Sequence, residues 1–188
     1  GADSGIGKDI SSFLAGADLG QGAWTLDFDL HFGTLPSNNG YFQWSFGMSG
    51  SNWNTISGDT DQDAYVLVIT GLAGTSTYRY RIYSLNNTDI VAGGTAIATF
   101  TRSATSNQVD YCRMKSDGTT LTVELFDDAN RSTLNESRSV PINSSITGLK
   151  YIKTDVHDQS SQTTFTVDIK KVTLWESSVT SKPANVQV

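Results

Sequence analysis

Three stretches in the second half of the chain decide the fold. Residues 117–128 read DGTTLTVELFDD, residues 148–156 read GLKYIKTDV, and residues 164–176 read TFTVDIKKVTLWE. Each stretch alternates apolar and polar residues, which is the pattern of a half-buried β-strand because successive side chains point to opposite faces. In the last stretch, Val167 and Ile169 keep one parity while Val172 and Leu174 keep the other. This change of parity predicts a β-bulge at residues 170–171.

The three stretches resemble strands of the concanavalin A-like lectin/glucanase superfamily, and within it the laminin-G-like modules of the pentraxin type. The matching residues are 117–125, 148–152 and 167–175, about a third of the chain. The resemblance implies an antiparallel two-sheet β-sandwich, the concanavalin A-like jelly roll. Its motifs are structural, so they bear on the fold more than on the function.

Working outward from these stretches, short alternating segments separated by Gly, Ser, Thr and Asn fill most of the chain, which predicts an all-β protein of about ten strands. We expect one domain at residues 1–176, with residues 1–22 as an N-terminal arm or edge strand and residues 177–188 as a C-terminal arm or linker. Three antiparallel pairs are predicted: 23–32 with 41–50, 65–71 with 78–84, and 109–115 with 121–126. The turn between the last two contains Gly118, which tolerates positive φ.

Charge and hydropathy exclude two kinds of partner. The formal net charge is −6 and the basic residues are scattered, so the chain lacks the basic surface that binds nucleic acid. No apolar run approaches the roughly 20 residues that span a bilayer, so no membrane insertion is expected. The single cysteine, Cys112, is expected to be a buried thiol.

Four N-x-S/T sequons favour a secreted or surface-exposed protein. They predict glycosylation at Asn86, Asn130, Asn135 and Asn143. Chance is the alternative, because the chain is rich in Asn, Ser and Thr.

The pattern most typical of a catalytic site is Asp27, Asp29 and His31, which project from one face of a single strand. Glucanases of the resembled superfamily carry E-x-D-x-E on such a strand, and DFDLH differs at both end positions. The interpretation we favour is a solvated polar face. Lyases on related jelly rolls use Tyr, His, Arg and Gln. Residues 78–81, YRYR, with either histidine supply several of these types, but no lyase motif is present.

Aromatic side chains in or near loops are candidates for stacking on sugar rings. They are Tyr41, Trp53, Tyr83 and Trp175, with Trp53 the strongest because it lies among Gly, Ser and Asn. Arg79 and Arg81 share a strand face with Tyr83 and could bind an acidic glycan. A solvated outer face is the alternative for these three residues.

Asp59, Asp61 and Asp63 form a D-x-D-x-D run in a polar segment. Calcium prefers several hard oxygen ligands on a flexible loop, so calcium is the candidate cofactor. The run lacks the Gly and Glu that complete an EF-hand, and a solvated acidic turn is the alternative.

We therefore expect a non-catalytic extracellular module that binds a glycan or polysaccharide, or mediates attachment at a cell or particle surface. The first alternative is a self-assembling surface protein, such as a fibre, spike or coat subunit, whose terminal arms make a homo-oligomer. The second is a polysaccharide hydrolase or lyase.

Overall fold

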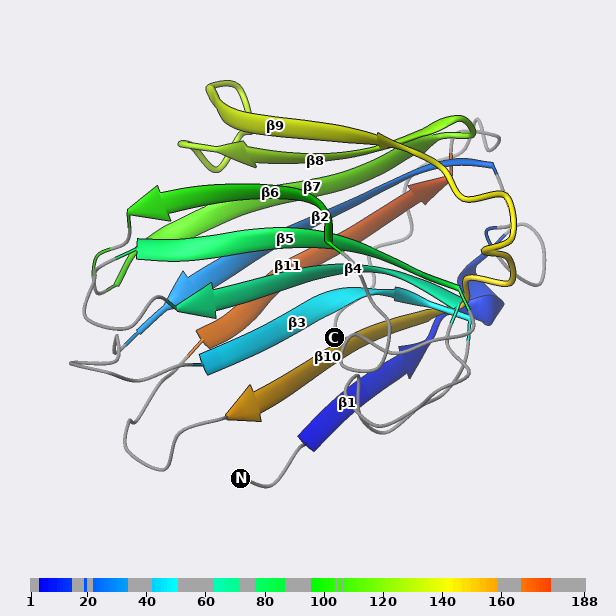
Figure 1. Ribbon diagram of the computed structural model, residues 1–188, viewed down its shortest axis with the longest axis horizontal. Helices are drawn as coiled ribbons and strands as arrows, with labels where there is room; N and C mark the ends of the chain where they lie inside the picture. The colour runs from blue at the N-terminus through cyan, green and yellow to red at the C-terminus, as the bar shows by residue number, and fades with distance from the viewer. Residues whose placement is uncertain are drawn as a thin grey trace. The chain divides into compact units, whose positions relative to one another are not determined.

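The computed structural model of the protein describes residues 4–14, 19, 22–33, 42–50, 63–71, 77–86, 96–103, 105, 107–158 and 167–176. Within these residues the chain is almost entirely β-structure, arranged as two antiparallel sheets (Figure 1). This confirms the predicted all-β fold class. The contacts between Cα atoms divide the chain into two compact units, and each unit contains one of the sheets.

The first unit contains a six-stranded sheet in the order β1-β10-β3-β4-β5-β6. Its strands are β1 (Ser4–Asp9), β10 (Tyr151–Asp158), β3 (Phe42–Ser49), β4 (Asp63–Gly71), β5 (Thr77–Asn86) and β6 (Ala96–Ser103). A 3-10 turn, η1 (Ser11–Phe13), follows β1. Residues 64–70 of β4 are all buried, so both faces of this central strand are covered. Gly47 of β3 must lack a side chain, because a Cβ there would lie 2.3 Å from the Tyr65 carbonyl oxygen.

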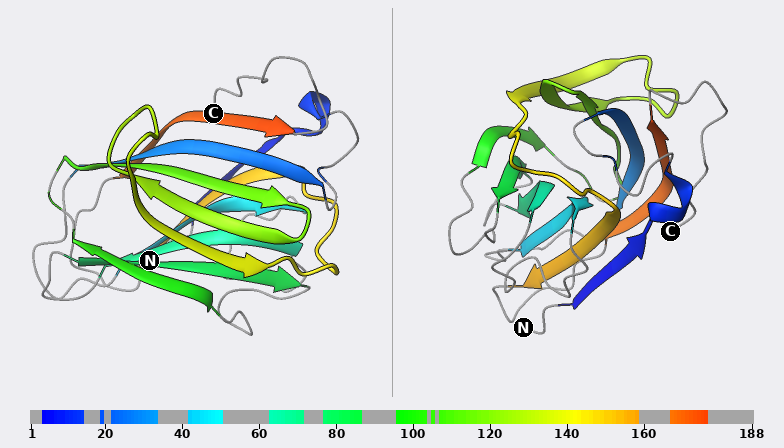
Figure 2. Two further views of the ribbon diagram at one scale, coloured as in Figure 1. Left: turned by 90° about the horizontal axis from the view of Figure 1, so that it is seen from above. Right: turned by 90° about the vertical axis from the view of Figure 1, so that its right-hand side faces the viewer.

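The second unit contains a five-stranded sheet in the order β11-β2-β7-β8-β9, whose strands lie side by side in Figure 2. They are β11 (Val167–Glu176), β2 (Ala23–Phe32), β7 (Val109–Asp117), β8 (Thr120–Phe126) and β9 (Leu134–Pro141). The alternation in the sequence gives this sheet an apolar face and a polar face. The apolar face is buried and includes Trp24, Leu26, Phe28, Leu30 and Phe32 of β2 and the predicted buried thiol of Cys112.

Two local predictions in this sheet are confirmed. The register between β11 and β2 shifts between Lys170 and Thr173, and Lys171 has a φ of 53°, so the parity change is a bulge. The turn between β7 and β8 holds Gly118 at a φ of 90°. Asp117 fixes the same turn, because its Oδ1 accepts hydrogen bonds from the backbone N–H of Thr119 at 2.8 Å and of Thr120 at 2.7 Å.

One predicted pairing is wrong and one strand was not predicted. β2 does not pair with β3, because β2 lies between β11 and β7 while β3 lies between β10 and β4. The polar segment between the predicted strands at Leu121 and Tyr151 was not assigned a strand, but it contains the edge strand β9. Its mostly polar sequence LNESRSVP is typical of an edge strand that avoids pairing with other chains, because it carries charges and a proline.

Candidate functional site

The polar face of the five-stranded sheet is ordered in rows that cross the strands. One row places Trp175 of β11 opposite Thr25 of β2, and Thr25 opposite Lys115 of β7. The next row places Asp27 of β2 opposite Arg113 of β7. Side chains that lie directly opposite on one face of a sheet are close enough to interact, so the ladder brings these residues together.

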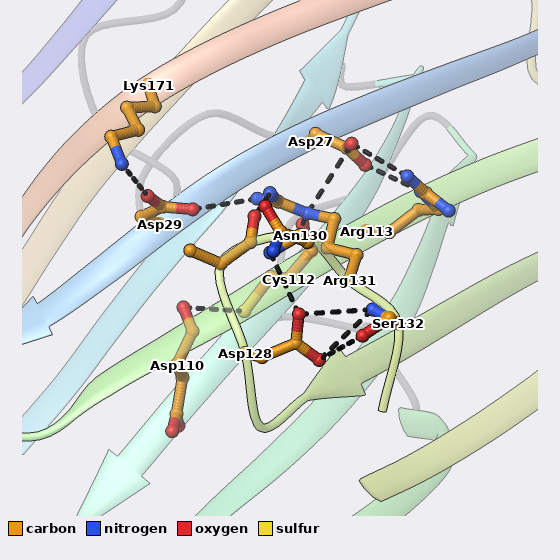
Figure 3. A network of polar contacts seen from close by, with 11 residues as sticks. Asp27, Asp29, Asp110, Cys112, Arg113, Asp128, Asn130, Arg131, Ser132 and Lys171 are labelled. Atoms are coloured by element: carbon orange, nitrogen blue, oxygen red, sulfur yellow. Dashed lines mark hydrogen bonds and ion pairs between the residues drawn. The ribbon is translucent and has the colours of Figure 1, made fainter. Parts of the chain in front are cut away.

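Asp27 and Arg113 form a bidentate ion pair (Figure 3). The Arg113 Nε donates to Asp27 Oδ1 at 2.7 Å and its Nη2 donates to Oδ2 at 2.8 Å. The guanidinium also lies over the ring of Phe126, with 5.4 Å between its Cζ and the ring centroid. The hydrogen bonds to Asp27 raise the pKa of Arg113 above its usual value, against the opposing effect of burial. Arg113 is therefore a fixed cation.

A second arginine reaches the same carboxylates from the loop between β8 and β9. Arg131 Nη2 donates to Asp29 Oδ1 at 2.8 Å, and its Nε lies 3.4 Å from Asp27 Oδ2. Lys171 Nζ lies 3.6 Å from the other Asp29 oxygen (Figure 3). These contacts join three cations and two carboxylates in one network.

The loop that carries Arg131 is organised by Asp128. This carboxylate accepts hydrogen bonds from the backbone N–H of Asn130, Ser132 and Thr133, the last at 2.7 Å. Burial acts to raise the pKa of Asp128, but the hydrogen bonds from Ser132 and Thr133 outweigh it and the pKa is lowered. Arg131 itself has a φ of 55°, a conformation that few non-glycine residues adopt. The loop thus holds the Arg131 guanidinium against the sheet.

Asp27 and Asp29 do not form the solvated polar face that we favoured. Their exposed fractions are 5% and 1%, because the two arginine side chains cover them. His31 lies farther along the strand, half-buried and opposite Asp168. With their oxygens facing arginine and lysine nitrogens, the two carboxylates have the arrangement of a structural ion-pair network rather than of a nucleophile and a general acid.

Beside this network lies a shallow pocket of about 260 Å³. Its lining consists of Thr25, Arg113, Lys115 and Trp175. Lys115 Nζ contacts Glu124 Oε1 at 2.5 Å, so each cation of the pocket has a carboxylate partner. The pocket combines a half-buried indole, a hydroxyl and two nitrogen donors, which is the mixture of an apolar wall and a few polar groups that binds small polar ligands. Trp175 was a predicted sugar-stacking residue.

The predicted ligand residues on β5 lie in the six-stranded sheet. Arg79 and Arg81 are half-buried. Tyr83 is 6% exposed and packs in an apolar cluster that also contains Ala64, Val66, Val68 and Leu85. Its ring is therefore not available at the surface for a sugar.

Arg79 shares a cross-strand row with residue types that the lyase alternative requires. Thr70 of β4 lies opposite Arg79 of β5 and opposite Gln43 of β3, and Gln43 lies opposite His157 of β10. The sequence separates these residues by up to about 110 positions, and only the strand order brings them together.

Several predicted residues lie outside the described ones: Tyr41, Trp53, Asp59 and Asp61. Asp63 begins β4 and is half-buried. Within the described ranges, no three His, Cys, Asp or Glu side chains form a group that could hold a metal ion. The same ranges contain no helix with the length and hydropathy that a membrane crossing requires.

All four sequon asparagines are among the described residues. Asn86, Asn130 and Asn135 are exposed, whereas Asn143 is half-buried. The Asn135 side-chain amide donates to Asp127 Oδ1 at 2.9 Å.

The sequence reasoning did not identify Arg113, Lys115 and Arg131. The first two alternate with apolar residues along 109–117, so a correct pairing of β2 with β7 would have placed them beside Asp27 and Thr25. Arg131 lies in a loop, and no pattern in the sequence indicates its partners.

Comparison with solved structures identifies similar folds. One is the CBM2 module of the evolved Dit of Lactobacillus casei BL23 phage J-1, with a TM-score of 0.58 and 9% identity over 98% of this chain and 70% of that one. Another is an alginate lyase from Pseudomonas aeruginosa, with a TM-score of 0.50 and 12% identity over 84% of this chain and 66% of that one. A third is the enzymatically active domain of tailspike protein 2 from bacteriophage CBA120, with a TM-score of 0.51 and 10% identity over 85% of this chain and 23% of that one.

At these identities the similarity shows the fold alone, and it confirms the predicted jelly-roll β-sandwich. No protein-family model matches the sequence, and no curated protein matches it. The laminin-G-like assignment stays a prediction.

Proposed function

We propose that this chain is a non-catalytic carbohydrate-binding module, and that its binding surface is the pocket of Thr25, Arg113, Lys115 and Trp175. The observation that carries the proposal is the position of Trp175 beside three polar side chains on a regular sheet. A sugar ring stacks its C–H face on a flat aromatic ring, while neighbouring hydroxyl and nitrogen groups bond its oxygens. Trp175, Thr25 and Lys115 offer this combination in one row.

The rigidity of the pocket supports the proposal. Arg113 is held by two hydrogen bonds to Asp27 and by the Phe126 ring, and Lys115 is held by its contact with Glu124. A ligand therefore pays little conformational entropy to order these groups, which favours affinity. The fold is also that of a CBM2 module and of an alginate lyase, which makes carbohydrate a suitable ligand class to test.

The proposal places the protein outside the cell or on a particle surface, as a secreted or attachment module. The exposed sequon asparagines Asn86, Asn130 and Asn135 are compatible with this location. Calcium bound by Asp59, Asp61 and Asp63 remains part of the proposal, because carboxylate oxygens are its preferred ligands.

A glycan-array screen of the purified chain, repeated with calcium and with a chelator, tests this function. We expect binding to a defined glycan that Trp175→Ala abolishes and Phe13→Ala leaves intact, since Phe13 is an exposed aromatic residue of the other unit. Loss of binding with the chelator would support the calcium site. Absence of binding to every glycan, with a solution mass well above one chain, would reject the proposal and favour a self-assembling surface protein.

A polysaccharide lyase is the second candidate, because Arg79, Gln43 and His157 share a cross-strand row in the six-stranded sheet. An arginine can neutralise a uronate, and a histidine can move the proton that β-elimination requires. The test is the release of unsaturated oligosaccharides from uronate polymers. Lyase activity that His157→Ala abolishes would establish this second function. Absence of product from every uronate polymer would reject it.

A further inference from the structure

The positive and negative side chains at the pocket differ in their exposure to solvent. The side chains of Arg113 and Lys115 are 28% and 42% exposed, whereas those of their partners Asp27 and Glu124 are 7% and 12% exposed. The two cationic side chains are therefore more exposed to solvent than the carboxylates that they contact. A ligand that enters the pocket meets hydrogen-bond donors, so it must supply acceptors.

The surrounding network adds to this asymmetry. Arg113, Lys115, Arg131 and Lys171 contact the three carboxylates Asp27, Asp29 and Glu124. Among these seven side chains one positive charge is in excess, although the whole chain has a formal net charge of −6. A local excess of positive charge attracts an anion to this part of the surface even when the molecule as a whole repels it.

Both outward cations keep donors for a ligand. Lys115 has three N–H donors, and its hydrogen bond to Glu124 uses one. Arg113 has five and its hydrogen bonds to Asp27 use Nε and Nη2, which leaves Nη1. A carboxylate or sulfate can accept charge-assisted hydrogen bonds from such groups. Trp175 lies in the same row as Lys115, separated from it by Thr25.

We propose that the pocket selects an acidic saccharide, a uronic acid or a sulfated sugar, whose ring lies on Trp175 and whose anionic group contacts Lys115 and Arg113. This inference rests on the proposed carbohydrate-binding function and adds the charge of the ligand to it. Lys115 is the specificity-determining residue, because it is the most exposed cation of the pocket. Thr25 lies between the ring and the anionic group and donates to a ring substituent.

The test measures the affinity of the full chain for three matched oligosaccharides by calorimetry: a uronate, a sulfated sugar and a neutral sugar of equal length. We expect one or both acidic sugars to bind at least tenfold more tightly than the neutral one, and added salt to weaken only the acidic ones. Comparison of the uronate with the sulfated sugar identifies which anionic group the pocket takes.

Three variants locate the interaction. Lys115→Gln should weaken binding of the acidic sugar about tenfold, the loss expected for one charge-assisted hydrogen bond, and leave the neutral sugar unchanged. Trp175→Ala should weaken both. Lys170→Gln is the matched control, because Lys170 is an exposed lysine in a different row of this sheet, opposite Asp29. Thermal unfolding of each variant verifies that it is folded.

The outcomes separate this inference from the function on which it rests. Equal affinity for acidic and neutral sugars, or an equal loss of both in Lys115→Gln, would overturn the acidic preference and retain the carbohydrate-binding module. Failure of all three sugars to bind, at concentrations where folded protein is verified, would overturn both.

Discussion

At the scale of single residues, Asp27 stands out because it binds two arginines at once. Its carboxylate accepts both hydrogen bonds from Arg113 and lies 3.4 Å from Arg131 Nε, while being 5% exposed. A buried ion pair contributes little net stability, but removal of one partner is costly because it leaves the other charge without compensation. The main effect of removing Asp27 is therefore the cost of leaving Arg113 and Arg131 without this carboxylate, rather than the loss of a strongly stabilising attraction.

We predict that Asp27→Asn destabilises the protein by about 2 kcal/mol, less than for a fully buried pair because Arg113 is partly exposed. The free energy of unfolding in urea measures this change. Asp168→Asn serves as the control, since Asp168 is an exposed aspartate on the neighbouring strand β11 and its replacement should stay within about 0.5 kcal/mol. Equal effects of the two substitutions would mean that the network is not coupled to folding.

Asp117 predicts a dependence on pH. Hydrogen bonds from the backbone N–H and hydroxyl of Thr119 and from the backbone N–H of Thr120 lower the pKa of Asp117. A lowered folded-state pKa stabilises the protein above the unfolded pKa, about 3.9 for aspartate, and this stabilisation is lost as the pH falls through the lower folded value.

We therefore expect Asp117→Asn to reduce stability at pH 7 and to lose less stability than the wild-type protein on acidification below about pH 4. Urea unfolding of both proteins at a series of pH values measures their stability at pH 7 and its loss on acidification. Parallel curves for the two proteins would contradict the assignment of this acid-sensitive contribution to Asp117.

At the scale of elements, the bulge in β11 shifts the register in which this strand pairs with β2. Lys171 occupies the extra position with a φ of 53°, and its side chain is 72% exposed. In this left-handed region a β-branched residue is strongly disfavoured, whereas in an extended strand it is favoured. The two neighbouring lysines therefore give opposite expectations for the same substitution.

Lys171→Val should destabilise the protein by about 1 kcal/mol, because a branched Cβ adds strain in the left-handed region to the strain that lysine already carries there. Lys170→Val, in extended backbone, should change stability by less than about 0.5 kcal/mol. Thermal or urea unfolding of the two variants distinguishes them. A destabilising Lys170→Val together with a neutral Lys171→Val would place the bulge one residue earlier.

The elements also show how far the sequence predicts this protein. Strong alternation predicted β2, the turn at Gly118 and the bulge in β11, because each depends on neighbouring residues. Alternation does not identify a partner strand, so β2 was paired wrongly with β3. β9 was missed because it is a mostly polar edge strand in which only Leu134 and Val140 are bulky apolar residues.

The candidate site could not be predicted in full for the same reason, because the sequence does not identify which strands are neighbours. Trp175 and Asp27 could be named from the sequence, but their neighbours Arg113 and Lys115 follow only from the β2–β7 ladder. Arg131 reaches Asp29 from 102 residues away through a loop, and local patterns carry no information on such a contact.

At the scale of the whole molecule, neither sheet is a continuous segment of the chain. The six-stranded sheet takes β1, β3 to β6 and β10, and the five-stranded sheet takes the strands between and after them. The chain thus leaves one sheet for the other after β1, β2, β6, β9 and β10.

We expect the protein to unfold in a single transition. Because the chain passes repeatedly between the two sheets, unfolding of one sheet frees the ends of strands in the other sheet. Tryptophan fluorescence and far-UV circular dichroism should give the same urea midpoint. Two separate midpoints would show that the two compact units unfold independently and would contradict the predicted single domain.

The order of the strands has a consequence for synthesis on the ribosome. β3 to β6 pair with their neighbours along the chain, apart from the β10 edge of β3, so this meander can assemble as it emerges. β2 emerges earlier, yet its neighbours are β7 and β11, the latter ending at Glu176. Until β7 and β11 have been synthesised, the edges of β2 lack their partner strands and its apolar residues stay exposed. We expect this segment to be the part of the nascent chain that most needs protection by chaperones.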